Sequence, residues 1–316
     1  MSRLAPVIFI MGPTAAGKTE LALQLADKYP VELISVDSAL VYRGMDIGTA
    51  KPDKAILAKY PHHLIDILDP ADAYSVGDFR RDALALMADI TARERVPVLV
   101  GGTMLYFNAL QQGLAELPEA DPTIRKELDE LAAEKGLIYL HEQLQQCDPI
   151  SAKRIHPNDP QRLQRALEIY RITGKSLTEL TQTSQSSLPY RIVKVILSPF
   201  ERSVLHQRIA TRYHNMVASG FIDEVASFFQ NPRYTANLPA MRSVGYRQVW
   251  QYLAGEYDKE TCIEKAIIAT RQMAKRQLTW LRKQQDGSWF DSGRDVPVEQ
   301  ITQFLSVNLA ELNFKT

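Results

Sequence analysis

A phosphate-binding loop near the N-terminus limits what this chain can fold into more than any other feature. The loop fits the pattern G-x-x-x-x-G-K-[ST] and consists of Gly12, Pro13, Thr14, Ala15, Ala16, Gly17, Lys18 and Thr19. An apolar run at residues 7–11 precedes it and a helical pattern at 21–29 follows it, which is the strand-loop-helix context that the motif requires. Such loops bind phosphate through backbone N–H groups and the positive end of the helix dipole. We expect Lys18 to neutralise phosphate charge and the Thr19 hydroxyl to bind Mg²⁺.

The composition excludes several other classes of protein. The 316 residues suffice for two domains or for one domain with an insertion, and their formal net charge of zero gives no general attraction to nucleic acid or membranes. Cys147 and Cys262 form no Cys-x-x-Cys pair, which argues against a zinc site and favours a reducing compartment. Because no segment approaches the roughly 20 apolar residues of a membrane helix, we expect a cytoplasmic monomer that binds no membrane.

Strand and helix patterns alternate through the first 117 residues. Strands are expected at 7–11, 31–36, 63–68 and 96–100, with helices at 21–29, 52–60, 79–93 and from 104. Ser75 and Asp78 resemble a capping box before the third helix. This alternation predicts an α/β fold, a P-loop NTPase-like doubly wound parallel sheet whose ligands bind at the carboxyl ends of its strands. Asp37 and Thr103 follow two such strands, so we expect both to meet the phosphate loop in one crevice.

The alternation then stops. Residues 118–188 show only helical patterns and are interpreted as an all-helical insertion domain between two parts of the core, 1–117 and 189–316. Residues 181–187 are polar and are expected to form a mobile loop. A strand at 190–197 returns to the sheet, and the remainder is expected to be helical at 201–219, 223–230, 239–252 and 258–285.

Asp37 and Thr103 each admit more than one role. Asp37 follows a strand and faces the phosphate loop, where a carboxylate can act as a general base or can organise Mg²⁺. A turn or helix cap is the alternative for Asp37. Thr103 follows Gly101 and Gly102, and glycines let a substrate approach the backbone. A helix N-cap is the alternative for Thr103.

Three basic segments are candidates for binding nucleic acid. For the long C-terminal helix the alternative is a solvated face with Trp280 in the core, and for residues 161–165 it is an exposed amphipathic helix. The long C-terminal helix carries Lys275, Arg276 and Arg282 around Trp280, without an acidic residue between Glu264 and Asp286. A basic stripe with an aromatic side chain is typical of contact with a nucleic-acid backbone. Residues 161–165 could bind phosphates and base edges, and the arginines and tyrosine of 241–247 could stack on unpaired bases. Arg212 is a further cation that could reach the phosphates.

Several segments, taken in this order, resemble one family: the tRNA dimethylallyltransferases, or tRNA isopentenyltransferases. They run over nearly the whole chain and comprise residues 12–19, 35–38 (Ser-Val-Asp-Ser), 42–52 (Tyr-Arg-Gly-Met-Asp-Ile-Gly-Thr-Ala-Lys-Pro), 62–64 (His-His-Leu), 101–106 (Gly-Gly-Thr-Met-Leu-Tyr), 159–162 (Asp-Pro-Gln-Arg), 240–247 (Ala-Met-Arg-Ser-Val-Gly-Tyr-Arg) and 276–282 (Arg-Gln-Leu-Thr-Trp-Leu-Arg). Eukaryotic members add a zinc finger that this sequence does not show, so the chain is similar to the bacterial type.

The resemblance implies that a dimethylallyl group passes from dimethylallyl diphosphate to N6 of the adenine just 3′ of the anticodon in tRNA, releasing diphosphate. Catalysis would then rest on Asp37 as base, on Thr103 bound to the amine or to Asp37, and on Lys18 and Arg212, which would hold the diphosphate with the phosphate loop and with Mg²⁺ on Thr19. The insertion would grip the anticodon arm. The resemblance places the tRNA contacts at Asp37, Ser38, Ala39, Leu40, Thr103, Arg125, Gln161, Arg162, Leu163, Gln164, Arg165, Arg242, Ser243, Val244, Gly245, Tyr246, Arg247, Lys275, Arg276, Gln277, Leu278, Thr279, Trp280, Leu281 and Arg282.

Two other classes of function are weighed against this one. A small-molecule or nucleoside kinase would share the phosphate loop, the sheet and an aspartate that accepts a hydroxyl proton, but it would give the basic C-terminal helix no purpose. A non-catalytic RNA-binding protein would leave Asp37 beside an intact phosphate loop unexplained.

Overall fold

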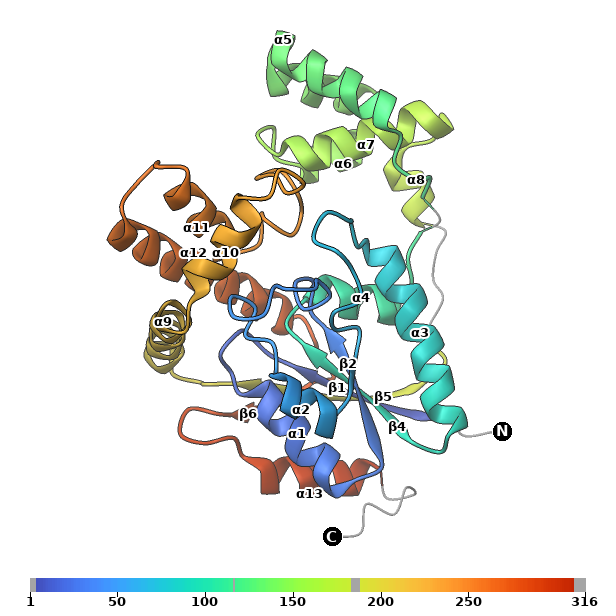
Figure 1. Ribbon diagram of the computed structural model, residues 1–316. Coiled ribbons are helices and arrows are strands. Elements are labelled where there is room, and N and C mark those ends of the chain that lie inside the picture. Colours follow the sequence, from blue (N-terminus) through green and yellow to red (C-terminus); the bar gives the residue numbers. More distant parts are fainter. Residues whose placement is uncertain (1–3, 116, 183–187, 310–316) are drawn as a thin grey trace. The chain divides into compact units, whose positions relative to one another are not determined.

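The computed structural model describes residues 4–115, 117–182 and 188–309 (Figure 1). The chain forms two compact units. The first contains the residues up to Asn108 and those from Pro189 onward, and the second is Ala109–Leu188. The insertion boundary expected at residue 118 therefore lies inside the second unit.

Unit 1 is built on a parallel sheet with the strand order β3-β2-β4-β1-β5-β6 among the residues described. Its central strands are apolar runs that are buried almost throughout, as expected where helices cover both faces of a parallel sheet. The doubly wound α/β fold that the sequence predicts is confirmed. The strands are β1 (Pro6–Met11), β2 (Val31–Val36), β3 (His62–His63), β4 (Val96–Gly101), β5 (Arg191–Ser198) and β6 (Ser288–Asp291).

Helices cover both faces of this sheet (Figure 1). On one face, Ile8 packs in a cluster with side chains of α1 and α13. On the other face, the ring of Phe9 lies 5.0 Å from that of Phe107 in α4, and Phe79 of α3 stacks on Tyr106 at 4.2 Å. Ile8 and Phe9 face opposite layers because side chains alternate along a strand. The bounds are α1 (Lys18–Lys28), α2 (Lys54–Lys59), α3 (Val76–Ala92), α4 (Met104–Gln112) and α13 (Val298–Asn308).

A second core of unit 1 consists of helices and of the segment that follows β2. Val41, Tyr42 and Met45 from that segment are buried against Tyr213, Phe221 and Tyr246 from three of these helices. This packing holds the helices over the chain that leaves β2. Their bounds are α9 (Arg202–Ala218), α10 (Phe221–Phe229), α11 (Tyr246–Leu253) and α12 (Lys259–Leu281).

Helices are the regular elements of unit 2 within its described residues, and they enclose an apolar core that includes Leu128, Leu144 and Leu163. Three of its helices begin alike, with an aspartate whose side chain accepts an N–H of the first turn and with proline next in the chain, a strong start signal. The helix α5 is interrupted at Gly136, where φ is 83°. The bounds are α5 (Pro122–Cys147), α6 (Pro149–Arg154), α7 (Pro160–Thr173) and α8 (Leu177–Gln182).

The capping box expected for Ser75 and Asp78 is present at the start of α3. Other expected elements differ from the structure. The strand expected at 63–68 ends at His63, because the positive φ angles of Leu64 (64°) and Asp66 (56°) turn the chain out of the sheet. The helix expected from 239 begins at Tyr246. Both β6 and α13 lie where the sequence predicted no such elements.

Two further expectations concern loops and membranes. The loop expected at 181–187 falls largely on residues outside the described part of the chain, and Thr181 belongs to α8. Within the described ranges, every helix is too short or too polar to span a bilayer.

Candidate active site

The carboxyl ends of three neighbouring strands lie at one level of the sheet. Gly101 at the end of β4 pairs with Met11 of β1 on one side and with Val36 of β2 on the other. The phosphate loop, Asp37 and Thr103 follow these three residues within a few positions. The register of the sheet therefore brings together the three segments that the sequence placed in one crevice.

A cavity of about 390 Å³ lies where these segments meet. Lys18, Asp37 and Thr103 line it, together with Arg212 from α9 and Gln277 from α12. Part of the wall is apolar, since Ile209, Met216, Val244 and Met273 also contribute to it. The cavity thus combines charged groups near the sheet edge with an apolar wall from the helical core, which suits a ligand with one anionic and one apolar part.

The phosphate loop has the geometry of an anion site. Gly17 has a φ of 91°, which a residue with a side chain rarely adopts, and α1 begins directly after it. The Lys18 ammonium donates a hydrogen bond to the Pro13 carbonyl, with 2.7 Å between the two atoms. A bound phosphate could replace that carbonyl as the partner of the ammonium.

Burial shifts the ionisation of the two cations in the cavity. Burial lowers the pKa of Lys18 to about 8; the negative charge of Asp37 partly offsets this shift, and the positive charge of Arg212 adds to it. The pKa of Arg212 is likewise lowered by burial, against the effect of Asp37. Two desolvated cations face one carboxylate, so an added anion would stabilise the charged forms of both.

The two carboxylate oxygens of Asp37 have different surroundings. Its Oδ1 accepts hydrogen bonds from the backbone N–H groups of Ala39 (2.9 Å) and Leu40 (3.4 Å), so the turn cap considered from the sequence is present. The other oxygen, Oδ2, has no hydrogen-bond donor among the described residues. Because Asp37 lines the cavity, this second oxygen leaves the carboxylate able to accept a proton while the first fixes its orientation.

Thr103 joins the ends of β4 and β2. Its Oγ1 accepts a hydrogen bond from the backbone N–H of Ser38 at 3.1 Å, and its own N–H donates to the carbonyl of Val36 at 3.2 Å. The resemblance implied that Thr103 binds either the amine or Asp37. Thr103 forms no hydrogen bond with Asp37 among the described residues and instead orients Ser38 beside it. The adjacent residues Ser38, Ala39 and Leu40 line the cavity as well.

Gln277 has a role that the sequence did not reveal. Its side-chain oxygen accepts the backbone N–H of Thr14 at 3.0 Å, and its side-chain nitrogen donates to the carbonyl of Gly102 at 2.9 Å. One amide from α12 thus joins the phosphate loop to the segment after β4. The motif placed Gln277 among the tRNA contacts, and only the fold shows that this side chain points inward.

The basic face of α12 is exposed. Lys275, Arg276 and Arg282 are all exposed, and Trp280 keeps 40% of its surface accessible. Leu281 is fully buried and Leu278 is packed against the helical core, so neither leucine presents its side chain to a partner. The alternative that placed Trp280 in the core is wrong, and the basic stripe with an exposed aromatic side chain remains a candidate surface for nucleic acid.

The segment 242–247 likewise contains both exposed and buried side chains. Arg242 and Arg247 are exposed, and residues 242–246 line the cavity. Tyr246 is 1% exposed and its ring packs against Phe221. The expectation that Tyr246 stacks on a base is therefore corrected, because its ring belongs to the core.

In unit 2 the expected tRNA contacts are also partly structural. Arg125 and Arg165 both pair with the buried carboxylate of Glu168, at 2.8 Å and 2.6 Å. Burial by itself would raise the pKa of Glu168, but hydrogen bonds from the two arginines outweigh it and lower that pKa. Leu163 lies in the core, Gln164 binds Asp129, and Gln161 and Arg162 are exposed at the start of α7. Gln161 and Arg162 are therefore the exposed candidates, and Arg125 pairs with Glu168 while its side chain stays 42% accessible.

Together the fold and the site define an α/β protein of the P-loop class, with a cavity that is lined by two cations and a carboxylate. Residues 40–284 match the IPP transferase family, and the chain belongs to this family. Similar solved structures include the full-length tRNA isopentenylpyrophosphate transferase from Bacillus halodurans (38% identity, 98% of each chain, TM-score 0.72). A tRNA delta(2)-isopentenylpyrophosphate transferase from Staphylococcus epidermidis shares 32% identity over 97% of this chain and 99% of that one, with a TM-score of 0.69. A eukaryotic dimethylallyltransferase acting on tRNA shares 27% identity over 97% of this chain and 77% of that one, with a TM-score of 0.79.

The lowered pKa of Lys18 predicts a pH dependence of anion binding. Below pH 8 the ammonium keeps its proton and attracts a diphosphate, and above about pH 8 it loses that charge. We expect the affinity for inorganic pyrophosphate, measured by titration calorimetry, to fall as the pH rises through this value. In Lys18→Arg the cation does not titrate, so a fall of the same size in this variant would contradict the assignment.

The two hydrogen bonds of Gln277 predict that it orders the phosphate loop. Gln277→Met keeps the length of the side chain and removes both bonds, each worth about 1 kcal/mol net. We expect the affinity for inorganic pyrophosphate to fall about 10-fold, which corresponds to about 1.4 kcal/mol. Gln272→Met, at an exposed position of the same helix, is the matched control. An unchanged or tighter affinity in Gln277→Met would show that the loop is ordered without this side chain.

Proposed function

We propose that this protein transfers a dimethylallyl group from dimethylallyl diphosphate to N6 of the adenine that follows the anticodon in tRNA. Membership of the IPP transferase family supports prenyl transfer, and the similar structures are named as enzymes acting on tRNA. The observation in this structure that carries the proposal is the cavity itself, which has two cations and a phosphate loop on one side, the carboxylate of Asp37, and an apolar wall.

The cations would act on the leaving group. When the C–O bond at the allylic carbon breaks, its electron pair goes to the diphosphate oxygen, and the negative charge grows there. Lys18, Arg212 and the backbone N–H groups of residues 15–19 are positioned to stabilise this charge, the usual task of such donors in catalysis. The positive charge that develops on the allyl group is delocalised and lies against the apolar wall, away from water.

The carboxylate would act on the acceptor. The lone pair of an exocyclic adenine amine is shared with the ring, so this nitrogen is a poor nucleophile. As N6 forms its bond to the allylic carbon, it must lose a proton, which Oδ2 of Asp37 would accept. The products are the N6-alkylated adenine, diphosphate and the proton on Asp37. The adenine would have to leave its stack in order to reach the cavity.

Mg²⁺ is the proposed cofactor. The Thr19 hydroxyl lines the cavity with the carboxylate of Asp37, and such hard oxygen atoms are the ligands that Mg²⁺ prefers. The described residues contain no cluster of three His, Cys, Asp or Glu side chains that would hold a metal without substrate, so most ligands would come from the diphosphate and water, as is usual for Mg²⁺. The ion would supply positive charge to the leaving diphosphate.

The tRNA would be held by exposed residues outside the cavity. In unit 1 these are Lys275, Arg276 and Arg282 on α12, with Trp280 as a stacking surface for a base. In unit 2 they are Gln161 and Arg162. A kinase would not need these surfaces, and the comparisons do not favour one.

Label transfer tests the function directly. Purified protein, Mg²⁺ and labelled dimethylallyl diphosphate are incubated with tRNA that lacks the modification, while ATP and a nucleoside are incubated with the protein in parallel. We expect label on the tRNA and none on tRNA in which the target adenine is replaced. Phosphate transfer from ATP without label on tRNA would replace the proposal by the kinase alternative.

The role of Asp37 predicts the effect of two substitutions on that reaction. Asp37→Asn keeps an oxygen that can cap the turn and removes the base, so we expect the single-turnover rate to fall at least about 100-fold. Asp37→Ala should reduce the rate further, because it also removes the cap. Binding of tRNA should stay within about twofold in Asp37→Asn, since the substitution alters one side chain and removes no positive charge that holds the phosphate backbone. Asp53→Asn, at the N-cap of α2, is the control, and a near-normal rate in Asp37→Asn would exclude Asp37 as base.

The exposed face of α12 predicts a salt-dependent contact with tRNA. Lys275→Glu should weaken tRNA binding about 10-fold and reduce the slope of log K against log salt by about one unit. Lys259→Glu makes the same change at the first residue of α12, roughly 24 Å away along the helix, and should have little effect. Equal effects of the two substitutions would show that only the total charge of the protein matters, and that this face of α12 is not a specific tRNA contact.

A further inference from the structure

We propose that Glu224 is a positioning residue, which sets Arg212 for the leaving diphosphate by fixing the loop of residues 46–52. This inference rests on the proposed function. Glu224 lies outside the motifs recognised in the sequence, and it is not among the residues that line the cavity. Its action would pass through the backbone of that loop, here called the anchored loop.

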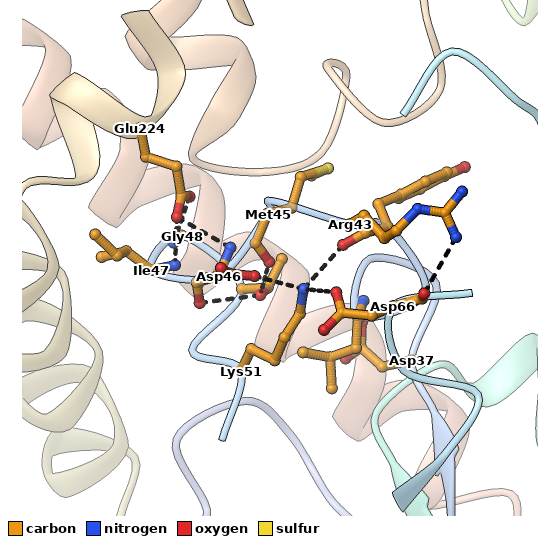
Figure 2. A network of polar contacts seen from close by, with 12 residues as sticks. Asp37, Arg43, Met45, Asp46, Ile47, Gly48, Lys51, Asp66 and Glu224 are labelled. Atoms are coloured by element: carbon orange, nitrogen blue, oxygen red, sulfur yellow. Dashed lines mark hydrogen bonds and ion pairs between the residues drawn. The ribbon is translucent and has the colours of Figure 1, made fainter. Parts of the chain in front are cut away.

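Glu224 binds three consecutive backbone N–H groups of the anchored loop (Figure 2). Its Oε2 accepts from Asp46 at 3.0 Å and from Ile47 at 2.6 Å, and its Oε1 accepts from Gly48 at 3.1 Å. Three charge-assisted hydrogen bonds to adjacent amides fix both the position and the orientation of a backbone segment. A neutral amide side chain at this place could not accept all three.

A fourth donor completes the environment of this carboxylate. The hydroxyl of Tyr246 donates a short hydrogen bond to Oε1 of Glu224. Burial raises the pKa of Tyr246, and the negative charge of Glu224 raises it further, so the phenol keeps its proton and remains a donor. The motif residue Tyr246 thus supports Glu224 from within the helical core.

Lys51 holds the anchored loop at its other end. Its side chain is only 3% exposed, and its ammonium pairs with the carboxylates of Asp46 and Asp66 and donates to the carbonyl of Tyr42 at 2.9 Å (Figure 2). Between the two anchors, Gly48 lies directly on the aromatic core: a Cβ added there would come within 2.0 Å of Phe221. The loop has little freedom to shift.

The anchored loop contacts the proposed catalytic cation. Gly48, Thr49 and Ala50 line the cavity, and the carbonyl of Thr49 accepts a hydrogen bond from Nη2 of Arg212 at 3.4 Å. The position of this carbonyl helps to set where the guanidinium lies. Displacing a charged catalytic group by even about 1 Å can cost 100-fold in rate, so a residue that fixes the carbonyl can control the reaction without touching the substrate.

A purely structural role for Glu224 makes a different prediction. If Glu224 only stabilised the fold, its loss would act independently of Arg212. If it acts through Arg212, its loss should cost little once Arg212 has been removed. A double-mutant cycle separates the two cases, because residues that act as one unit give non-additive effects.

The experiment compares wild type, Glu224→Gln, Arg212→Ala and the double variant in label transfer from dimethylallyl diphosphate to tRNA. We expect Glu224→Gln to lower kcat/KM for the donor about 10-fold or more, while tRNA binding stays within about twofold. In the Arg212→Ala background the same change should cost less than about twofold. Asp223→Asn, at the exposed neighbouring position in the first turn of α10, is the matched control.

Each result decides the inference. Equal losses in both backgrounds, or a Glu224→Gln variant with normal kcat/KM, would overturn it. If Glu224→Gln does not fold, Tyr246→Phe removes one donor to the same carboxylate, and its smaller loss should likewise vanish without Arg212. If wild type transfers no label, the proposed function fails, and the same cycle measured on affinity for inorganic pyrophosphate still tests whether Glu224 acts through Arg212.

Discussion

The pairing of Gly101 with both Met11 and Val36 is the constraint on which the site depends. Because three neighbouring parallel strands end at one level, the residues that follow them must share one edge of the sheet. A register shift of one residue in β2 would move Asp37 about 3.3 Å along the strand and separate it from the phosphate loop. Thr103 and Gln277 add hydrogen bonds between the segments after the strands, so the geometry of the edge extends into the loops that form the cavity.

The cavity holds two cations whose partners in this structure are largely backbone carbonyls. Lys18 donates to the carbonyl of Pro13, and Arg212 to that of Thr49. Neutral carbonyls compensate a desolvated charge less than an anion does, which agrees with the lowered pKa of both groups. The site is therefore prepared for a ligand with negative charge. A carbonyl that orients a cation without neutralising it leaves that cation available to a leaving group.

The sequence predicted the parts of the site that depend on local pattern. The phosphate loop and the meeting of Asp37 with Thr103 at the sheet edge follow from strand-helix alternation, and the structure confirms both. Contacts between distant segments could not be predicted in this way. Gln277 and Tyr246 lie in motifs that indicated RNA contact, yet the first points at the phosphate loop and the second is buried, because only tertiary packing decides which side of a helix faces inward. The short edge strand β6 escaped prediction because its four residues depend on pairing with β5.

A phosphate loop binds the phosphate groups of the substrate, and the residues across the cavity determine which bond of that substrate breaks. Phosphoryl transfer requires an acceptor in line with a phosphorus atom, whereas prenyl transfer requires space for an apolar chain beside the diphosphate and a base near the carbon that carries the diphosphate. Met216, Met273 and Val244 supply apolar surface in this cavity. Asp37 supplies a carboxylate with one oxygen bound in a turn and one without a hydrogen-bond donor among the described residues. The same loop can therefore serve either reaction, and the apolar surface and the carboxylate around this cavity suit the proposed cleavage at carbon.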